Sequence, residues 1–256
     1  MTMDRLLAAT AAVEDHHFWF KGLRRHARLM LDQAGVRPGL RLVVDCGAGT
    51  GRNLEWLATY GPAIGVDLSP YGIEVARRRG RPIVRGSVTA LPVRTAAADL
   101  ATSFDVLYCM DDRGEQQTLD EMWRILRPGG VALVNTAALA FLRGSHSTLS
   151  DERRRYTPAQ LRRSLERAGF VVERVTFTNM SVFPPALLRR GWEQITGRAS
   201  VPSDADLHLP PAPVNRFFDW CLTVESRILP RMNLPVGTSV MAVARKVDAS
   251  GRRLAA

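Results

Sequence analysis

The sequence has few of the residues that build disulfide frameworks, metal centres or membrane spans. Only three cysteines occur in 256 residues, Cys46, Cys109 and Cys221, and no two form the C-x-x-C pair that marks zinc or redox sites. No apolar run approaches the ~20 residues of a membrane-spanning helix, and the N-terminus carries acidic residues instead of a signal-peptide pattern. We therefore expect a cytoplasmic protein without disulfides, a bound metal or a transmembrane segment.

Lysine is almost absent, because only Lys21 and Lys246 occur among 35 basic residues and the other 33 are arginines. The formal net charge of +10 would suit a nucleic-acid partner if the basic side chains gathered on one face. The arginines are instead scattered, and their densest runs, 77–79 and 153–155, lack interleaved aromatic residues on which single strands stack. The lopsided ratio is typical of GC-rich coding sequences. Composition therefore disfavours nucleic acid as the substrate.

Short apolar runs alternate with amphipathic helical patterns from about residue 40. This alternation predicts a parallel sheet with helices on both faces. The predicted strands are 40–45, 63–67, 82–85, 99–103, 131–136, 170–178 and 238–246, and the predicted helices between them are 52–59, 70–79, 116–126 and 158–168. An Arg-Pro-Gly-Gly segment at 127–130 predicts a turn that stops a helix before a strand.

The pattern divides the chain into a core and three flanking segments. We expect a helical N-terminal cap at 1–38, a core at 39–180 and 237–247, a helical insertion at 181–236, and a disordered tail at 248–256. The insertion is predicted to hold helices at 185–195 and 215–229.

The second of these helices has one apolar face, formed by Phe217, Cys221, Val224 and Ile228. That face suits packing on the core, a wall for an apolar acceptor, a dimer contact or shallow peripheral contact with a membrane surface. The chain is therefore expected to be a monomer or a homodimer. Basic and acidic residues are nearly balanced in the insertion, which disfavours a strongly basic membrane anchor.

A glycine-rich loop follows the first predicted strand and reads Asp45-Cys46-Gly47-Ala48-Gly49-Thr50-Gly51. Glycines allow a positive φ and let a ligand lie against the backbone, and the N–H groups at the start of the next helix attract an anion or carboxylate. Asp67 ends the second predicted strand, where a carboxylate can accept hydrogen bonds from ribose hydroxyls. The loop and Asp67 together predict a nucleotide-cofactor site.

The spacing of the glycines distinguishes between two cofactors. Dinucleotide enzymes use G-x-G-x-x-G, whereas these glycines fall at 47, 49 and 51, with Arg52 where the third would stand. The stretch from 43 to 130 instead resembles class I S-adenosylmethionine (SAM) dependent methyltransferases of the bacterial small-molecule type. The resemblance rests on four motifs in order: V-V-D-C-G-A-G-T-G from 43, G-V-D-L-S-P from 65, G-S-V-T-A-L-P from 86, and L-R-P-G-G from 126.

This resemblance implies a fold, a cofactor and a set of binding residues. The fold is an α/β, Rossmann-like, doubly wound sheet of seven strands, mostly parallel with an antiparallel last strand, and the cofactor is SAM. The implied cofactor-binding residues are Asp45, Gly47, Ala48 and Gly49 around the methionine part, Asp67 at the ribose, Leu68, Ser87 and Val88 at the adenine, and Tyr108 near the sulfonium. The family usually carries an acidic residue where Ser87 stands, so we expect a weaker or rearranged adenine contact there.

The N-terminal cap crowds aromatic, histidine and arginine residues just before the core. In enzymes that it resembles, a leading helix closes over the cofactor, so Trp19 and either Arg24 or Arg25 are candidates to shape the site or reach the methionine carboxylate. The alternative is that the Phe-Trp-Phe run at 18–20 packs this helix onto the sheet.

His146 is the first candidate for a general base, because it lies in a loop after the fifth strand, at the edge of the sheet where ligands bind. A histidine of near-neutral pKa can take a hydroxyl proton. The alternative is an ordinary surface histidine. Tyr156, Glu152 and Asp111 are weaker candidates.

The leading hypothesis is a methyltransferase that acts on an oxygen or nitrogen of a small molecule, such as a specialised metabolite or a saccharide. Methyl transfer is a direct displacement that needs chiefly alignment and a dry pocket. A hydroxyl acceptor calls for a base, whereas a neutral amine does not. The alternatives are a SAM-binding relative without transfer activity, a methyltransferase for a lipid-linked acceptor and, disfavoured by the glycine spacing, an NAD-dependent oxidoreductase.

Overall fold

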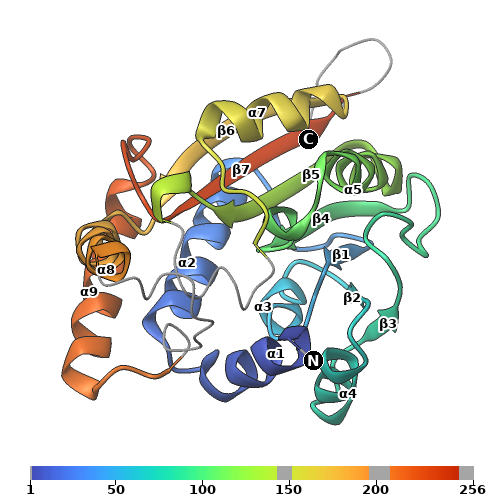
Figure 1. Cartoon of the computed structure of the whole chain (residues 1–256). Helices are drawn as coiled ribbons and strands as arrows, with labels where there is room; N and C mark the ends of the chain where they lie inside the picture. The colour runs from blue at the N-terminus through green and yellow to red at the C-terminus, as the bar shows by residue number, and fades with distance from the viewer. Residues whose placement is uncertain (1, 143–151, 196–207, 248–256) are drawn as a thin grey trace.

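A seven-stranded sheet runs through the middle of the computed structural model, which describes residues 2–142, 152–195 and 208–247 (Figure 1). The strands are β1 Val43–Cys46, β2 Ala63–Asp67, β3 Ile83–Arg85, β4 Ala98–Phe104, β5 Leu126–Ala137, β6 Phe170–Thr178 and β7 Ser239–Lys246. Their order is β3-β2-β1-β4-β5-β7-β6. Strands β1 to β5 pair in parallel, whereas β7 runs antiparallel to both β5 and β6. The predicted sheet, with its antiparallel last strand, is confirmed.

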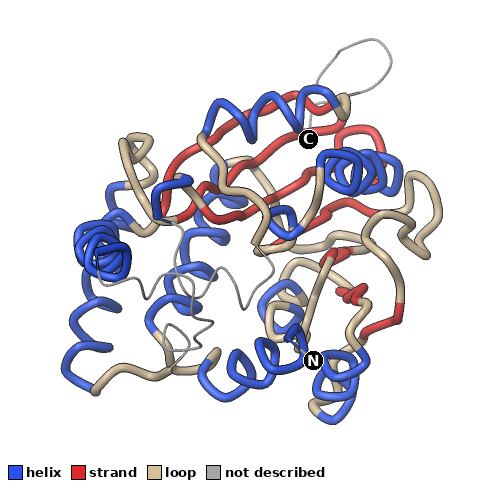
Figure 2. Tube along the Cα trace, in the orientation of Figure 1, coloured by secondary structure: helices blue, strands red, loops and turns tan. Residues whose placement is uncertain are grey.

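Helices cover both faces of this sheet (Figure 2). The α-helices are α1 Thr2–Val13, α2 Phe18–Gln33, α3 Leu54–Leu57, α4 Pro70–Arg78, α5 Asp112–Ile125, α7 Pro158–Arg167, α8 Phe183–Ile195 and α9 Ala212–Ile228. Short 3₁₀ turns are η1 Leu107–Cys109, η2 Ala140–Leu142 and η3 Met180–Val182. Within the described ranges, no helix combines the length and the apolar character needed to cross a bilayer. The tail predicted to be disordered, 248–256, lies outside the described residues.

The core forms two layers because neighbouring residues of a strand point to opposite faces. Val43, Leu100 and Leu133 pack in one cluster with α2 and α3. Val44 and Ala101, each one position further along its strand, pack in another cluster with α5 and α7. Burial on both faces explains why the strands read as nearly continuous apolar runs.

Several element boundaries differ from the sequence prediction for local reasons. The first strand begins at Val43 and not at residue 40, because the N–H groups of Arg41 and Leu42 donate to the Asp99 carboxylate (2.5 and 3.1 Å). The expected turn at 127–130 lies inside β5, whose start pairs with β4 across an irregularity in register. Helix α5 begins four residues early, since the Asp111 carboxylate caps it by accepting from Gly114 N (2.7 Å).

The N-terminal cap consists of two helices joined at a corner, residues 14–17, and its second helix pairs with the insertion. Asn215 of α9 accepts a hydrogen bond from Phe18 N and donates one to His16 O, both at 2.9 Å. Asp219 of α9 forms ion pairs with Lys21 and Arg25 of α2. These contacts join two segments that are about 200 residues apart in the sequence. The division of the chain into a cap, a core and an insertion stays a prediction.

Candidate functional site

The glycine-rich loop leaves β1 at the carboxyl edge of the sheet, and its backbone requires glycine. Gly47, Gly49 and Gly51 have φ values of 83°, 53° and 71°, in the left-handed region. A Cβ atom on Gly47 would also lie 2.3 Å from Cγ2 of Val106, which no side chain can tolerate. The predicted loop is therefore a tight turn that β4 and the following segment approach closely.

Asp67, at the end of β2, ties this loop to the start of α4. Its Oδ2 accepts from Gly49 N (2.7 Å) and its Oδ1 accepts from Ser69 N (2.8 Å). Ser69 then caps α4 by accepting from Gly72 N (3.1 Å). Each carboxylate oxygen has a second acceptor position beyond these bonds, so Asp67 is oriented by the backbone and keeps capacity for two hydroxyl donors.

A cavity of about 850 Å³ lies over the loop and Asp67. This is near the upper end of the ~300–1,000 Å³ that is usual for ligand pockets. The structure brings together most of the predicted site residues on its wall, namely Trp19, Arg24, Gly47, Ala48, Gly49, Asp67, Leu68, Val88 and Tyr108. The side chain of Leu68 is 57% exposed, so it offers an apolar surface to a ligand.

Asp45 and Ser87 are the two predicted cofactor residues that do not line the cavity. Asp45 is 1% exposed beneath the loop, where its Oδ1 accepts from Thr102 Oγ1 (2.7 Å). Burial raises the pKa of Asp45 to about 7. The Ser87 hydroxyl bonds to Thr89 Oγ1 (2.7 Å) and accepts from Thr89 N (3.2 Å). Both side chains thus hold the loops that shape the cavity, and their direct contact with a cofactor stays a prediction.

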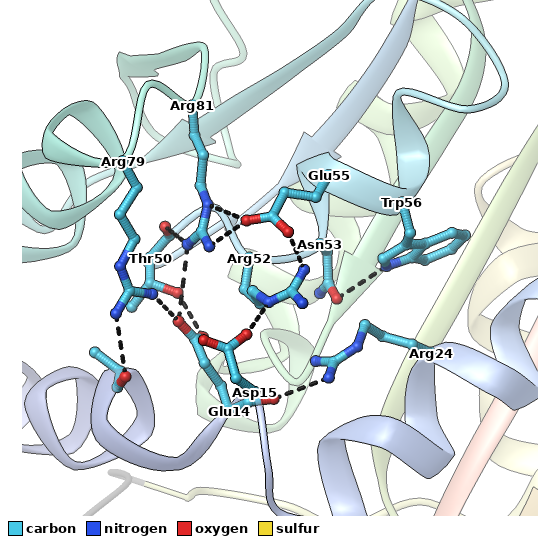
Figure 3. Close-up of polar contacts among 11 residues, drawn as sticks. Glu14, Asp15, Arg24, Thr50, Arg52, Asn53, Glu55, Trp56, Arg79 and Arg81 are labelled. Carbon is cyan, nitrogen blue, oxygen red and sulfur yellow. Dashed lines mark hydrogen bonds and ion pairs between the residues drawn. The ribbon is translucent and has the colours of Figure 1, made fainter.

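Glu14, at the corner between α1 and α2, clamps the N-terminal cap onto the glycine loop (Figure 3). Its side chain is 3% exposed; Oε2 accepts from Thr50 Oγ1 (2.6 Å) and Oε1 accepts from Arg79 Nη1 (2.7 Å). Arg81 reinforces this contact, because it donates to Thr50 O (2.9 Å) and pairs with Glu55 (2.5 Å). We call Glu14, Thr50, Glu55, Arg79 and Arg81 the corner network.

Arg24 lies beside the corner network with its guanidinium at the cavity wall. Its Nη2 donates to Glu14 O (2.9 Å), and the side chain is 9% exposed. Burial, and then the positive charge of Arg52, lower the pKa of Arg24 to about 10. Arg24 therefore stays protonated at neutral pH and presents a partly desolvated cation to the cavity. Trp19 is also brought to the wall, at the first turn of α2, where His17 Nδ1 accepts from its backbone N (3.1 Å).

Asp105 follows β4 and also lines the cavity. Its φ of 59° is left-handed, which is uncommon for a residue other than glycine and is often associated with functional sites. Asn135 of β5 holds it, since Nδ2 donates to Oδ1 and Asn135 O accepts from Asp105 N, both at 2.9 Å. Burial raises the pKa of Asp105 to about 7.

Glu152 and Arg155 line the cavity near Asp105 as a two-bonded ion pair (2.6 and 2.9 Å). Their exposed fractions are 2% and 9%, so the pair is largely removed from solvent. Two other weaker candidates have structural contacts: the Tyr156 hydroxyl donates to Leu107 O (3.4 Å), and Asp111 caps α5. His146 lies outside the described residues, so its predicted role as a base stays a prediction.

Comparison with known proteins indicates the family. Residues 44–134 match a family described as a methyltransferase domain. A probable SAM-dependent methyltransferase of Mycolicibacterium smegmatis is 32% identical over 164 residues, which are 62% of each chain. The chain thus contains a methyltransferase domain and is similar to SAM-dependent methyltransferases.

Two further comparisons bear on the fold and on the extent of the match. A malonyl-[acyl-carrier protein] O-methyltransferase of Coxiella burnetii is 34% identical over 48% of this chain and 43% of its own. The chain thus spans less than two thirds of the length of the curated relatives that it matches. Among solved structures, the complex of the Haloferax volcanii Trm112 activator with a putative methyltransferase aligns at a TM-score of 0.61 and 23% identity, covering 96% and 97% of the chains. This likeness establishes the shared fold.

The cofactor of the family is SAM, and the cavity of this methyltransferase fits it. Gly47 lets the backbone approach a ligand closely, and Asp67 offers an oriented carboxylate to ribose hydroxyls. Leu68 offers an apolar side chain to adenine. Arg24 supplies a cation for a carboxylate. The chemistry of the donors and acceptors therefore matches the parts of SAM.

Sequence reasoning missed Glu14 and Asp105, and it named Glu152 as a weaker candidate without its partner Arg155. The positions of Glu14 and Asp105 depend on contacts with residues 30 or more positions away. Asp105 carried a usable signal, since it directly follows an apolar strand at the edge where parallel sheets bind ligands. Glu14 carried none, because nothing in a local pattern distinguishes a buried carboxylate from a solvated one.

Proposed function

We propose that this chain is an enzyme that transfers the methyl group of SAM to an oxygen or nitrogen of a small, largely apolar acceptor. The proposal rests on one cavity that is lined both by SAM-compatible residues at the glycine loop and by Asp105, a carboxylate of raised pKa. Apolar side chains from the cap and the insertion also line this cavity, among them Phe18, Phe20, Leu23, Val182, Pro185 and Phe218.

SAM supplies an electrophilic methyl group, and the residues of the chain align the acceptor and handle its proton. The acceptor lone pair forms a bond to the methyl carbon while the bond from carbon to sulfur breaks. A proton leaves the acceptor hydroxyl or ammonium group and passes to the Asp105 carboxylate. A base works best when its pKa lies near the working pH, which favours Asp105 at neutral pH.

The lining of the cavity favours a metabolite with an apolar body over a saccharide. A saccharide presents hydroxyl groups on every side, and each one needs a hydrogen-bond partner when it leaves water. The wall formed by α2, α8 and α9 offers chiefly apolar side chains. An acceptor with one polar reacting group and an apolar remainder fits this division.

The test is release of S-adenosylhomocysteine from SAM by the purified chain with a panel of acceptors. The panel pairs apolar alcohols and amines, such as phenols and isoprenoid alcohols, with monosaccharides of similar size. We expect turnover with an apolar member and not with the monosaccharides. Tight SAM binding without release of product for any acceptor would contradict transfer activity and support the alternative of a SAM-binding relative that does not catalyse transfer.

A further inference from the structure

Helix α9 presents a row of exposed side chains along one face. They are Val214, Arg216, Phe217, Trp220, Arg227 and Ile228, which we call the α9 outer face. Phe217 and Trp220, Arg216 and Trp220, and Trp220 and Arg227 are three, four and seven residues apart, and at ~3.6 residues per turn all six fall within about half of the helix circumference. Phe217 and Trp220 are 56% and 63% exposed, although aromatic side chains of this size are usually well buried.

The opposite side of α9 is fixed to the body of the protein. Leu222 is fully buried, and Glu225 accepts hydrogen bonds from Asn179 N and Ser181 N (2.6 and 3.1 Å). Asp219 pairs with Lys21 and Arg25 of α2, as described above. The orientation of α9 is therefore determined, and its outer face is directed away from the core.

The charges of the helix are segregated in the same way. Both acidic residues of α9, Asp219 and Glu225, lie on the inner side, so within this fully described helix the exposed charges are the arginines Arg216 and Arg227. A face that combines tryptophan, phenylalanine and arginine is typical of helices that lie in a membrane interface. Exposed Leu187 and Leu188 of α8 add apolar side chains on the insertion, at the left of Figure 1.

We propose that the α9 outer face docks on an anionic lipid surface. Negatively charged headgroups complement Arg216 and Arg227, while Phe217 and Trp220 enter the boundary between headgroups and acyl chains. A second copy of the chain fits less well, because a symmetric pair would bring the same arginines together with no exposed acid of α9 to offset them. The net charge of +10 adds a long-range attraction in the same direction.

Docking would leave α9 between the lipid and the cavity, a separation of about one helix diameter (~10 Å), since Phe218 of α9 and Pro185 of α8 line the cavity. If the proposed function holds, the acceptor is then an amphiphile taken from that surface, with its reacting group directed toward Asp105. This second step rests on the proposed function, whereas docking itself does not.

The experiment is co-flotation with large unilamellar vesicles, in the absence of SAM and acceptor. One vesicle preparation is phosphatidylcholine alone, and the other contains equal parts of phosphatidylcholine and phosphatidylglycerol. We expect partition onto the anionic vesicles that falls as salt is added, and little onto the neutral ones. A Phe217→Ser/Trp220→Ser variant should partition at least roughly tenfold less. An Arg216→Glu/Arg227→Glu variant should partition more than roughly 25-fold less, because 25-fold corresponds to loss of the two positive charges alone and the glutamates add repulsion.

Matched control variants lie away from the insertion. Val171→Ser on the edge strand β6 removes another exposed apolar side chain, and Arg113→Glu on α5 reverses another exposed arginine, so both should partition like the unchanged protein. Failure of the folded protein to float with anionic vesicles would overturn the proposal, as would an equal loss in the controls. A dimer that dissociates in the Phe217→Ser/Trp220→Ser variant would assign the face to a second copy instead. Because SAM binding is measured separately, these failures are distinct from a failure of the proposed function.

Discussion

The two halves of the cavity are built in different ways. Most of the cofactor half consists of backbone turns and short-range polar contacts, such as the bond from Gly49 N to Asp67, and Arg24 of the cap adds a cation to it. The acceptor half is assembled from α2, the end of β4, α8 and α9, which are brought together by contacts across most of the chain. The difference implies that changes in the first half act on SAM binding, and changes in the second act on turnover.

The largest expected effect is in the cofactor half. Asp67→Ala should abolish detectable SAM binding, because it removes the ribose acceptor and leaves Gly49 N and Ser69 N without their partner. Isothermal titration calorimetry measures this, with thermal unfolding as the check on folding. Retained tight binding by the variant would show that the two halves are not divided as described.

Asp105→Asn should leave SAM affinity within about twofold and lower turnover by roughly 10²–10⁴-fold, the usual contribution of a general base. The pKa of Asp105 is raised to about 7, so the residue is protonated and inactive as a base at lower pH. The rate for the unchanged protein should therefore fall as the pH drops below about 7, and the variant should lack this step. An unaltered pH profile would remove Asp105 from the reaction.

The corner network gives a prediction about stability. Glu14→Ala leaves the buried Arg81 and the partly exposed Arg79 without their shared carboxylate. We expect a loss of about 3 kcal/mol in the free energy of unfolding, at the lower end for a broken buried pair because Arg79 reaches solvent. Chemical denaturation measures it. Glu14→Gln, which keeps the packing and an acceptor for Thr50, should lose less; equal losses would indicate that the negative charge facing Arg79 and Arg81 matters there, and not packing or the bond from Thr50.

The smallest expected effect concerns Leu68. Leu68→Ala removes apolar surface from the predicted adenine contact, but the side chain is already 57% exposed. A loss of about 1 kcal/mol, or roughly fivefold in SAM affinity, is expected from the area involved. Isothermal titration calorimetry of the variant and of the unchanged protein with SAM, at one temperature, measures this difference in affinity. An effect as large as that of Asp67→Ala would mean that Leu68 shapes the loop and does not merely contact the ligand.

The sequence predicts the cofactor half well because its determinants are local. Strand 63–67 and strand 170–178 match β2 and β6 residue for residue, and the glycine loop, Asp67 and Leu68 lie together as expected. Asp45 and Ser87 were expected at the cofactor, yet their side chains bond to Thr102 and Thr89. A motif specifies which residues form a loop more reliably than the direction in which each side chain points.

The acceptor half was harder to predict because its polar groups owe their properties to distant partners. Asp105 acquires a raised pKa only when the folded chain buries its carboxyl group, and the hydrogen bond from Asn135 acts against this rise. The same limit holds for Glu14 at the cofactor half, which becomes buried only when the cap packs on the glycine loop. Neither burial can be predicted from a periodic pattern in the sequence.

The most direct test of the account is calorimetric titration of the unchanged protein with SAM and, separately, with NAD. The cavity, the glycine spacing and the family predict binding of one SAM per chain and no measurable binding of NAD. Binding of NAD with no binding of SAM would contradict the assignment of the glycine loop and Asp67, and with it the proposed methyl transfer.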